Sequence, residues 1–170
     1  MLGQSETTIW DFALAWYKVP GVQADCLTAQ NDFGLDVTAL IFALYRARHG
    51  LGFDAVASAQ LARTMSAQFV EPLRNVRVAL KTGPQEASPG DRQALREEVK
   101  IAELHSEKLI LKALVSLPVQ AYAINYEGAV CAIADAYKVG NDYRLHALLK
   151  RLANAAQNMG SYAGDVLGER

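Results

Sequence analysis

Residues 10–37, WDFALAWYKVPGVQADCLTAQNDFGLDV, decide the fold, because several helix boundaries fall inside or beside them. Thr8 is a favourable N-cap residue just before the stretch. Pro20 ends the helix that follows, and Gly34 is placed as the left-handed residue that ends a second one. Asp36 then caps a third helix. The stretch therefore predicts a compact set of short helices.

Apolar residues keep a helical spacing along the rest of the chain, and no run alternates in the way that a strand requires. Pro72 either kinks a longer helix or lies in the first turn of a new one, and we favour the new helix. Residues 82–90 predict a loop, because glycine, proline and serine gather there. The further expected helices span residues 37–49, 71–81, 91–117 and 119–137, with one more beginning near 54 and a last one near 142.

The same spacing selects the side chains expected to face the core. In the helix after Asp54 these are Val56, Leu61, Met65 and Phe69. In the long helix they are Leu95, Val99, Ala102, Leu109, Ala113 and Leu117, with Ile110 and Leu114 widening the stripe near its end. The predicted fold is an all-α, single-domain bundle of six to eight helices with one long central helix.

Composition excludes several classes of protein. The chain has 170 residues, 51% of them hydrophobic, which suits one domain with a sizeable core. A formal net charge of −1 argues against nucleic-acid binding through overall charge. No secretory signal and no apolar run long enough for a membrane span is recognisable. Cys26 and Cys131 form no CxxC pair, so we expect reduced thiols in a cytoplasmic protein.

Three segments carry a resemblance to a known family. They are Tyr17-x-x-Pro20-Gly21-Val22-x-x-x-Cys26-Leu27-x-x-Gln30 with Gly34-x-Asp36-Val37, then Val70-Glu-Pro72-Leu73-Arg74, and Arg96-Glu-Glu-Val-Lys100-x-Ala-Glu103. Over about residues 8–115 the chain resembles the bacterial proteins grouped as domain of unknown function 2390. Ala29 stands where that pattern has leucine. The resemblance implies a compact bacterial cytosolic domain and no particular activity.

We therefore expect one helical domain over residues 1–159 and a flexible tail over 160–170. Within that domain, 8–117 is the family-like part and 118–159 forms the C-terminal helices. The long helix could also cross to a second copy of the chain, so a homodimer is possible.

A basic stripe is the first candidate site. Arg74, Arg77 and Lys81 step by three and four residues, which places them on one helix face. Such a stripe suits phosphate, RNA or an acidic protein surface. The alternative is a solvated face that interacts with the acidic first helices of the same domain.

Gln30 and Asp36 are the second candidate site, because both are polar residues within the N-terminal helical hairpin. Helix capping explains Asp36, and Gln30 is expected to bond free carbonyls at the end of its helix. The alternative is a small polar pocket between helices, which is a common place for ligands in bundles. Cys26 shares a face with Val22 and Phe33 and is expected to be a buried, structural cysteine.

No catalytic motif, metal-ligand spacing or phosphate-binding glycine pattern is present, so no cofactor and no metal are predicted. Three functions remain as hypotheses. The first is an interaction or adaptor protein that binds another protein. The second is a small-ligand binder or enzyme with a pocket near Gln30 and Asp36. The third is a nucleic-acid-associated protein that uses Arg74, Arg77 and Lys81.

Overall fold

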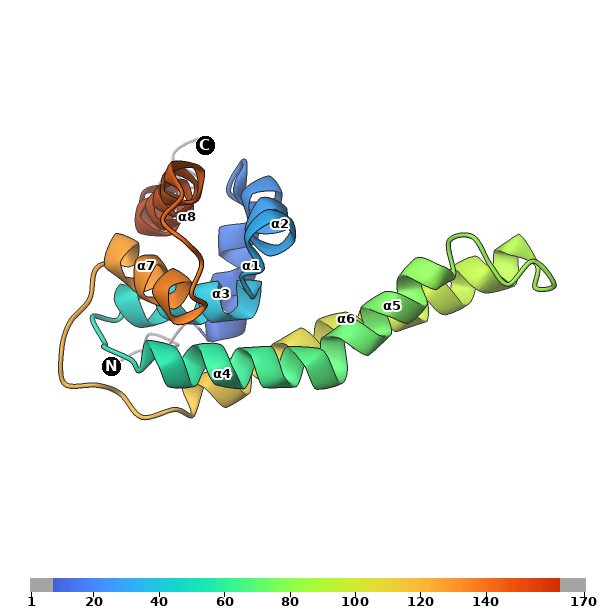
Figure 1. Cartoon of the computed structure of the whole chain (residues 1–170), viewed down its shortest axis with the longest axis horizontal. Coiled ribbons are helices and arrows are strands. Elements are labelled where there is room, and N and C mark those ends of the chain that lie inside the picture. The colour runs from blue at the N-terminus through green and yellow to red at the C-terminus, as the bar shows by residue number, and fades with distance from the viewer. Residues whose placement is uncertain (1–7, 163–170) are drawn as a thin grey trace, which may run out of the picture.

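The computed structural model describes residues 8–162, and within them the chain is built from helices (Figure 1). Apart from one isolated bridge between Gly52 and Gln120, the described residues form no β-structure. This confirms the predicted all-α fold with one long helix. The elements are α1 (Ile9–Tyr17), α2 (Val22–Phe33), α3 (Val37–Arg48), α4 (Ala55–Met65), the π-helical turn η1 (Ser66–Val70), α5 (Glu71–Ala79), α6 (Pro89–Val115), α7 (Tyr126–Ala136) and α8 (Tyr143–Tyr162).

Local capping explains where these helices begin and end. Thr8 and Asp11 form the capping box of α1, in which each side chain bonds the other residue's backbone N–H. Asp54 accepts a hydrogen bond from the backbone of Ala57 at the start of α4. Gly34 ends α2 at a φ of 65°, a conformation that favours glycine. These boundaries agree with the sequence prediction.

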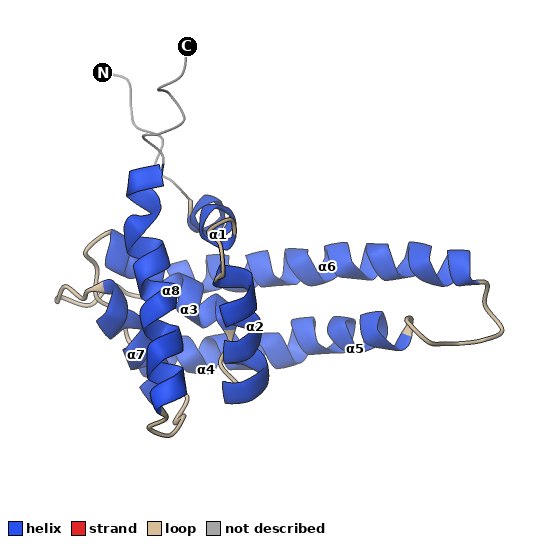
Figure 2. Ribbon diagram, turned by 90° about the horizontal axis from the view of Figure 1, so that it is seen from above, coloured by secondary structure: helices blue, strands red, loops and turns tan. Residues whose placement is uncertain are grey.

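We call α1–α4, the second half of α6, α7 and α8 the helical body (Figure 2). Its core forms around α3, which is apolar on nearly all sides and packs mainly on α7 and α6, with α1, α2, α4 and α8 around it. Trp16 of α1 is fully buried, and its Nε1–H donates to the carbonyl oxygen of Leu152 in α8 at 3.2 Å. Arg46 of α3 is buried as well, and its Nη2 donates to the carbonyls of Val115 and Leu117 at 3.1 and 2.8 Å. This arginine thereby closes the C-terminal end of α6.

α4, η1 and α5 form one continuous rod, so the described residues make seven helical rods when these three are counted together (Figure 1). Pro72 lies in the first turn of α5, directly after the π-turn. The π-turn explains how the rod accommodates this proline. Proline has no N–H and its ring clashes with the carbonyl four residues earlier in an α-helix. The backbone N–H of Glu71 reaches five residues back to Ser66, which widens the turn there. The predicted helix over 71–81 is thus a continuation of α4 and ends at Ala79.

α5 and the first half of α6 leave the body together as an antiparallel pair, which we call the projecting hairpin (residues 71–103) (Figures 1 and 2). α5 buries no side chain completely. The first half of the long helix α6 therefore lies outside the body. The sequence had instead suggested a central helix that packs along the bundle.

Several of the expected core positions are wrong. Val56 and Phe69 are exposed, as are Leu95 and Leu109 on α6. The buried face of α6 consists of Glu103, Ile110, Leu111 and Leu114. Ile110 and Leu114 are therefore buried as expected, whereas the expected stripe is wrong at Leu95 and Leu109. The apolar spacing could not indicate that the buried face of α6 begins with Glu103. The predicted division into residues 1–159 and a tail over 160–170 stays a prediction, since residues 163–170 lie outside the described part.

Candidate functional site

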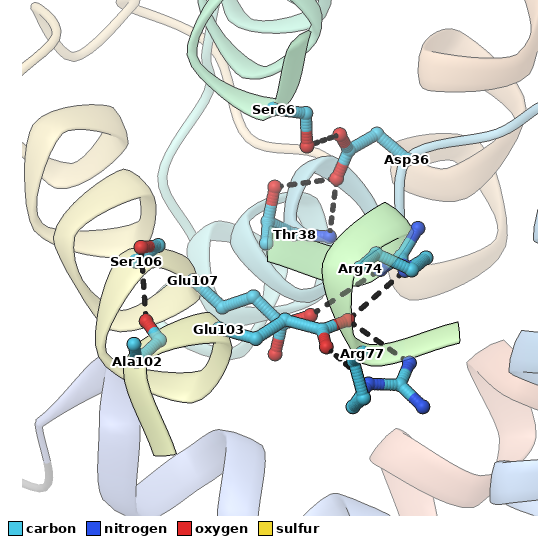
Figure 3. A network of polar contacts seen from close by, with 9 residues as sticks. All are labelled: Asp36, Thr38, Ser66, Arg74, Arg77, Ala102, Glu103, Ser106 and Glu107. Atoms are coloured by element: carbon cyan, nitrogen blue, oxygen red, sulfur yellow. Dashed lines mark hydrogen bonds and ion pairs between the residues drawn. The ribbon is translucent and has the colours of Figure 1, made fainter. Parts of the chain in front are cut away.

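Glu103 is the centre of an ion-pair cluster between α5 and α6 (Figure 3). Arg74 Nε donates to Glu103 Oε1 at 3.0 Å, and Arg77 Nε donates to Glu103 Oε2 at 2.6 Å. Burial alone would raise the pKa of Glu103, but the hydrogen bonds from Arg77 and Arg74 outweigh it and hold the pKa below its usual value. The cluster is therefore ionised at neutral pH and joins the two helices of the projecting hairpin.

This cluster changes the interpretation of the basic stripe. Arg74 and Arg77 lie on one face of α5, but that face is turned toward α6. Lys81 lies beyond the end of α5 and is exposed. The partners of the two arginines are glutamates of α6, whereas the sequence suggested the acidic first helices. Two members of the stripe thus serve contacts within the chain.

Asp36 is the centre of a second group of hydrogen bonds, at the start of α3 (Figure 3). Its Oδ1 accepts from the backbone N–H of Thr38 at 2.9 Å and from the Thr38 hydroxyl at 2.6 Å. Its Oδ2 accepts from the hydroxyl of Ser66 at 2.5 Å. Asp36 therefore caps α3, as predicted, and also ties α3 to the π-turn.

A cavity of about 900 Å³ lies between these two groups of contacts. Its wall includes Gln30, Asp36 and Arg74, which the sequence had placed in two separate candidate sites. The other lining residues are Trp10, Ala13, Leu14, Tyr17, Gln23, Asn31, Gly34, Leu35, Val37, Thr38, Ile41, Arg63, Ser66, Val70, Glu71, Asn75, Leu104, Glu107, Leu111 and Tyr137. Helices from both halves of the sequence build this wall. Arg77 and Lys81 are not among its lining residues.

Glu107 lines the cavity, and the sequence analysis did not name it as a candidate. It lies one turn after Glu103, and its Oε1 is 3.7 Å from Arg74 Nη2. Burial raises its pKa to about 7, with Arg74 opposing the shift and Glu103 and Asp36 adding to it. About a third of the side chain remains accessible, on the cavity wall. The signal was present in the sequence, since Glu103 and Glu107 precede Ile110 and Leu114 at helical spacing.

Aromatic side chains form further parts of the wall. Burial raises the pKa of Tyr17 and of Tyr137. The guanidinium of Arg63 lies over the Tyr137 ring, 4.5 Å from its centroid. Behind Tyr17, burial raises the pKa of Cys26 to about 12, and the thiol is almost inaccessible. Cys26 therefore has the character of a structural cysteine rather than a nucleophile.

Comparison of the sequence with protein-family models identifies the family of this chain. The family described as "Protein of unknown function (DUF2390)" matches residues 8–114. The chain belongs to this family. No curated protein and no solved structure matched the chain.

The DUF2390 match includes nearly the whole cavity wall. Every lining residue lies within residues 8–114 except Tyr137, which closes the wall from the end of α7. α7 and α8 of this DUF2390 protein lie beyond the matched part, although α7 packs directly on α3.

Within residues 8–162, no group of three or more histidine, cysteine, aspartate or glutamate side chains is arranged to hold a metal ion. None of the helices in that range combines the length and apolar character needed to cross a membrane. The chemistry available in the cavity is that of amide, hydroxyl, carboxylate and guanidinium groups beside aromatic rings.

Proposed function

We propose that this protein binds a small organic molecule in the cavity between α1, α2, α3, α6 and the π-turn. The observation that carries the proposal is the cavity itself, whose volume of about 900 Å³ lies within the usual range of ligand sites. Polar side chains converge in it while the rest of the wall is apolar. That combination supports binding of a molecule with both polar and apolar parts.

The position of the π-turn adds to this argument. Ser66 and Val70 of η1 both line the cavity. π-turns interrupt regular helical hydrogen bonding and recur at functional sites. Here the turn places Ser66 against Asp36 and leads directly into the helix that carries Arg74. The irregular helix thus supports a function for the cavity beyond packing.

Native mass spectrometry of the protein captured from its source organism tests the proposal. We expect a small-molecule adduct on the wild-type chain and its loss in Leu104→Trp, which places an indole in the cavity. Leu109→Trp is the matched control, since Leu109 is a leucine of α6 with similar exposure that does not line the cavity. An adduct that survives Leu104→Trp, or a wild-type chain without any adduct, would contradict the proposal.

Gln30→Ala provides a finer test with a probe ligand once an adduct is identified. Gln30 lines the cavity, and this substitution leaves the cap of α3 intact. We expect weaker binding with an unchanged circular dichroism spectrum. Asp36→Ala is less suitable alone, because it removes the bonds to Thr38 and Ser66 as well.

Protein interaction is the second candidate function, and the projecting hairpin favours it. Val76 and Val78 of α5 and Leu95 and Ile101 of α6 are exposed there. The native mass spectrum of the wild-type chain should then contain the mass of a second protein, either another protein or a second copy of this chain. The double variant Val78→Asp and Leu95→Asp should lose that mass. A partner mass that persists in this variant would place the interaction elsewhere. The bacterial, cytoplasmic location implied by the family resemblance stays a prediction.

Nucleic-acid binding stays a prediction with less support. Arg74 and Arg77 both bond Glu103, so part of their positive charge is already balanced within the chain. Binding that falls steeply with salt, and that is lost in Arg74→Ala plus Arg77→Ala, would restore this hypothesis.

A further inference from the structure

We infer that the molecule bound in the cavity is an organic amine whose ammonium group contacts Glu107 and whose apolar part lies along α6. This inference rests on the proposed function, because it names the chemical class of the ligand for the same site. It follows from which charged groups of the cavity already have partners and which do not.

The other two carboxylates of the site are satisfied within the chain. Glu103 accepts hydrogen bonds from both Arg74 and Arg77. Asp36 accepts three, from the backbone N–H and hydroxyl of Thr38 and the hydroxyl of Ser66. Neither carboxylate therefore needs a ligand to complete its hydrogen bonding.

Glu107 differs from both. Among the described residues it receives no hydrogen bond, and its ion pair with Arg74 spans 3.7 Å. It lines the cavity directly. A carboxylate in a partly buried site gains most from a charged donor, which forms the strong type of hydrogen bond. An ammonium group supplies that donor.

An anionic ligand would find no comparably unpaired cationic side chain among the described residues that line the cavity. Arg74 directs its Nε to Glu103, and Arg63 is an exposed residue that stacks on the Tyr137 ring. Around Glu107, the charged groups of the lining and of the ion-pair cluster include four carboxylates against three guanidinium groups. They are Asp36, Glu71, Glu103 and Glu107 against Arg63, Arg74 and Arg77. When Glu107 is ionised, an ammonium group balances this excess, whereas another anion increases it.

The surroundings of Glu107 supply the place for the apolar part. Leu104 and Leu111 lie three residues before and four residues after it, so all three share one face of α6. Trp10 of α1 also lines the cavity, and the Lys108 ammonium lies over its ring, 5.2 Å from the centroid. Aromatic and aliphatic walls beside a carboxylate suit an amine that carries a ring or an alkyl chain.

The inference predicts a dependence on pH. Several ionisable groups face Glu107 from its own helix and from the elements around it. These are Arg74 and Arg77 of α5, Glu103 of α6, Asp36 before α3 and Tyr17 of α1. Burial, with the charges of the two arginines and the two carboxylates of this set, raises the pKa of Glu107 to about 7. An alkylammonium, by contrast, stays protonated to about pH 10. Affinity for an amine should therefore rise about tenfold from pH 6 to pH 8, as Glu107 ionises.

Three probes of similar size and different charge test the inference by isothermal titration calorimetry. They are phenethylamine, 2-phenylethanol and 3-phenylpropanoate. We expect phenethylamine to bind most tightly at pH 8 and to lose about ten times its affinity in Glu107→Gln. Glu97→Gln is the control, since Glu97 is an exposed glutamate on the same helix outside the cavity. Circular dichroism of each variant checks its folding.

The wild-type comparisons need no variant and can overturn the inference by themselves. Equal or tighter binding of 3-phenylpropanoate contradicts it, and so does an amine affinity that is flat between pH 6 and pH 8. If the alcohol or the acid binds at least as tightly as the amine and Leu104→Trp removes that binding, the cavity is a ligand site and only the amine assignment fails. If no probe binds and the native mass spectrum contains no adduct, the inference and the proposed function fail together.

Discussion

The helical body buries Trp16, Phe12 and Phe42 almost completely, whereas α5 in the projecting hairpin buries no side chain. Apolar burial therefore stabilises the body, and each large core side chain contributes up to about 3 kcal/mol. In the hairpin, the bonds of Glu103 to Arg74 and Arg77 join α6 to α5. Such a difference predicts a rigid body and a hairpin that opens more easily. The candidate ligand cavity lies where the two regions meet.

The largest expected effect tests the body. Trp16→Ala removes a fully buried ring and its hydrogen bond to Leu152, so we expect a loss of about 3–5 kcal/mol in the free energy of unfolding. Urea denaturation followed by circular dichroism measures it. A loss below about 1 kcal/mol would mean that the first helix is not part of the core.

The second prediction tests the hairpin. Glu103→Gln leaves two arginines without their carboxylate, and we expect a loss of about 2 kcal/mol, less than for a fully buried pair because both arginines are partly exposed. Hydrogen exchange should increase in residues 71–103 more than in α3. Glu97→Gln serves as the control. Equal exchange in both regions would contradict the division into body and hairpin.

The pKa of Glu103 gives the sign of the associated pH effect. Its folded-state pKa is below the usual value, so the ion pairs stabilise the hairpin at neutral pH and this contribution is lost as the pH falls through that lower pKa. Hairpin exchange should therefore rise at acid pH before the body unfolds.

The third prediction concerns the junction of the two regions. Glu107 has a pKa of about 7, above its ordinary 4.5, so the folded chain holds an extra proton between these values. Stability should fall as the pH rises through this window, by about 1 kcal/mol after allowance for the accessible carboxyl. Glu107→Gln should remove this slope in urea denaturation at pH 5, 6, 7 and 8. If the free energy of unfolding depends on pH in the same way in the wild-type chain and in Glu107→Gln, the raised pKa of Glu107 is refuted.

The smallest expected effect comes from the outer face of the hairpin. Leu95→Ala should change stability by no more than about 0.5 kcal/mol, because Leu95 is exposed. Leu148→Ala in α8 is the matched substitution in the body and should cost about 2–5 kcal/mol. A large loss for Leu95→Ala would indicate that another surface covers the hairpin in solution.

Helix boundaries were predictable from the sequence because the N-caps join residues only two or three positions apart. Thr8, Gly34, Asp36 and Asp54 all act as predicted. The choice of buried face was less predictable, since it depends on which helix lies opposite. Glu103 faces inward only because α5 brings two arginines to it.

The candidate site also combines residues that the sequence indicated with residues that only the folded structure identifies. Gln30, Asp36 and Arg74 were recognised as candidates, and the structure brings these three to one cavity. Glu107 shares a helical spacing with Glu103, Ile110 and Leu114, but this spacing gives neither its pKa nor its place in the wall, because both arise from distant segments. The continuity of α4 and α5 was missed because proline ordinarily signals a boundary.

The π-turn also has a consequence for helical phase. Each residue of an α-helix turns the chain by about 100°, so one extra residue within a turn rotates everything that follows. Upstream, Ala59 and Ala62 of α4 are packed in the body, while downstream Arg74 and Arg77 of α5 point to α6. η1 thus lets one continuous rod present a small apolar face to the body and a charged face to its hairpin partner. Deleting a single residue from Ser66–Val70 would turn both arginines out of register with Glu103 without changing any side chain of α5.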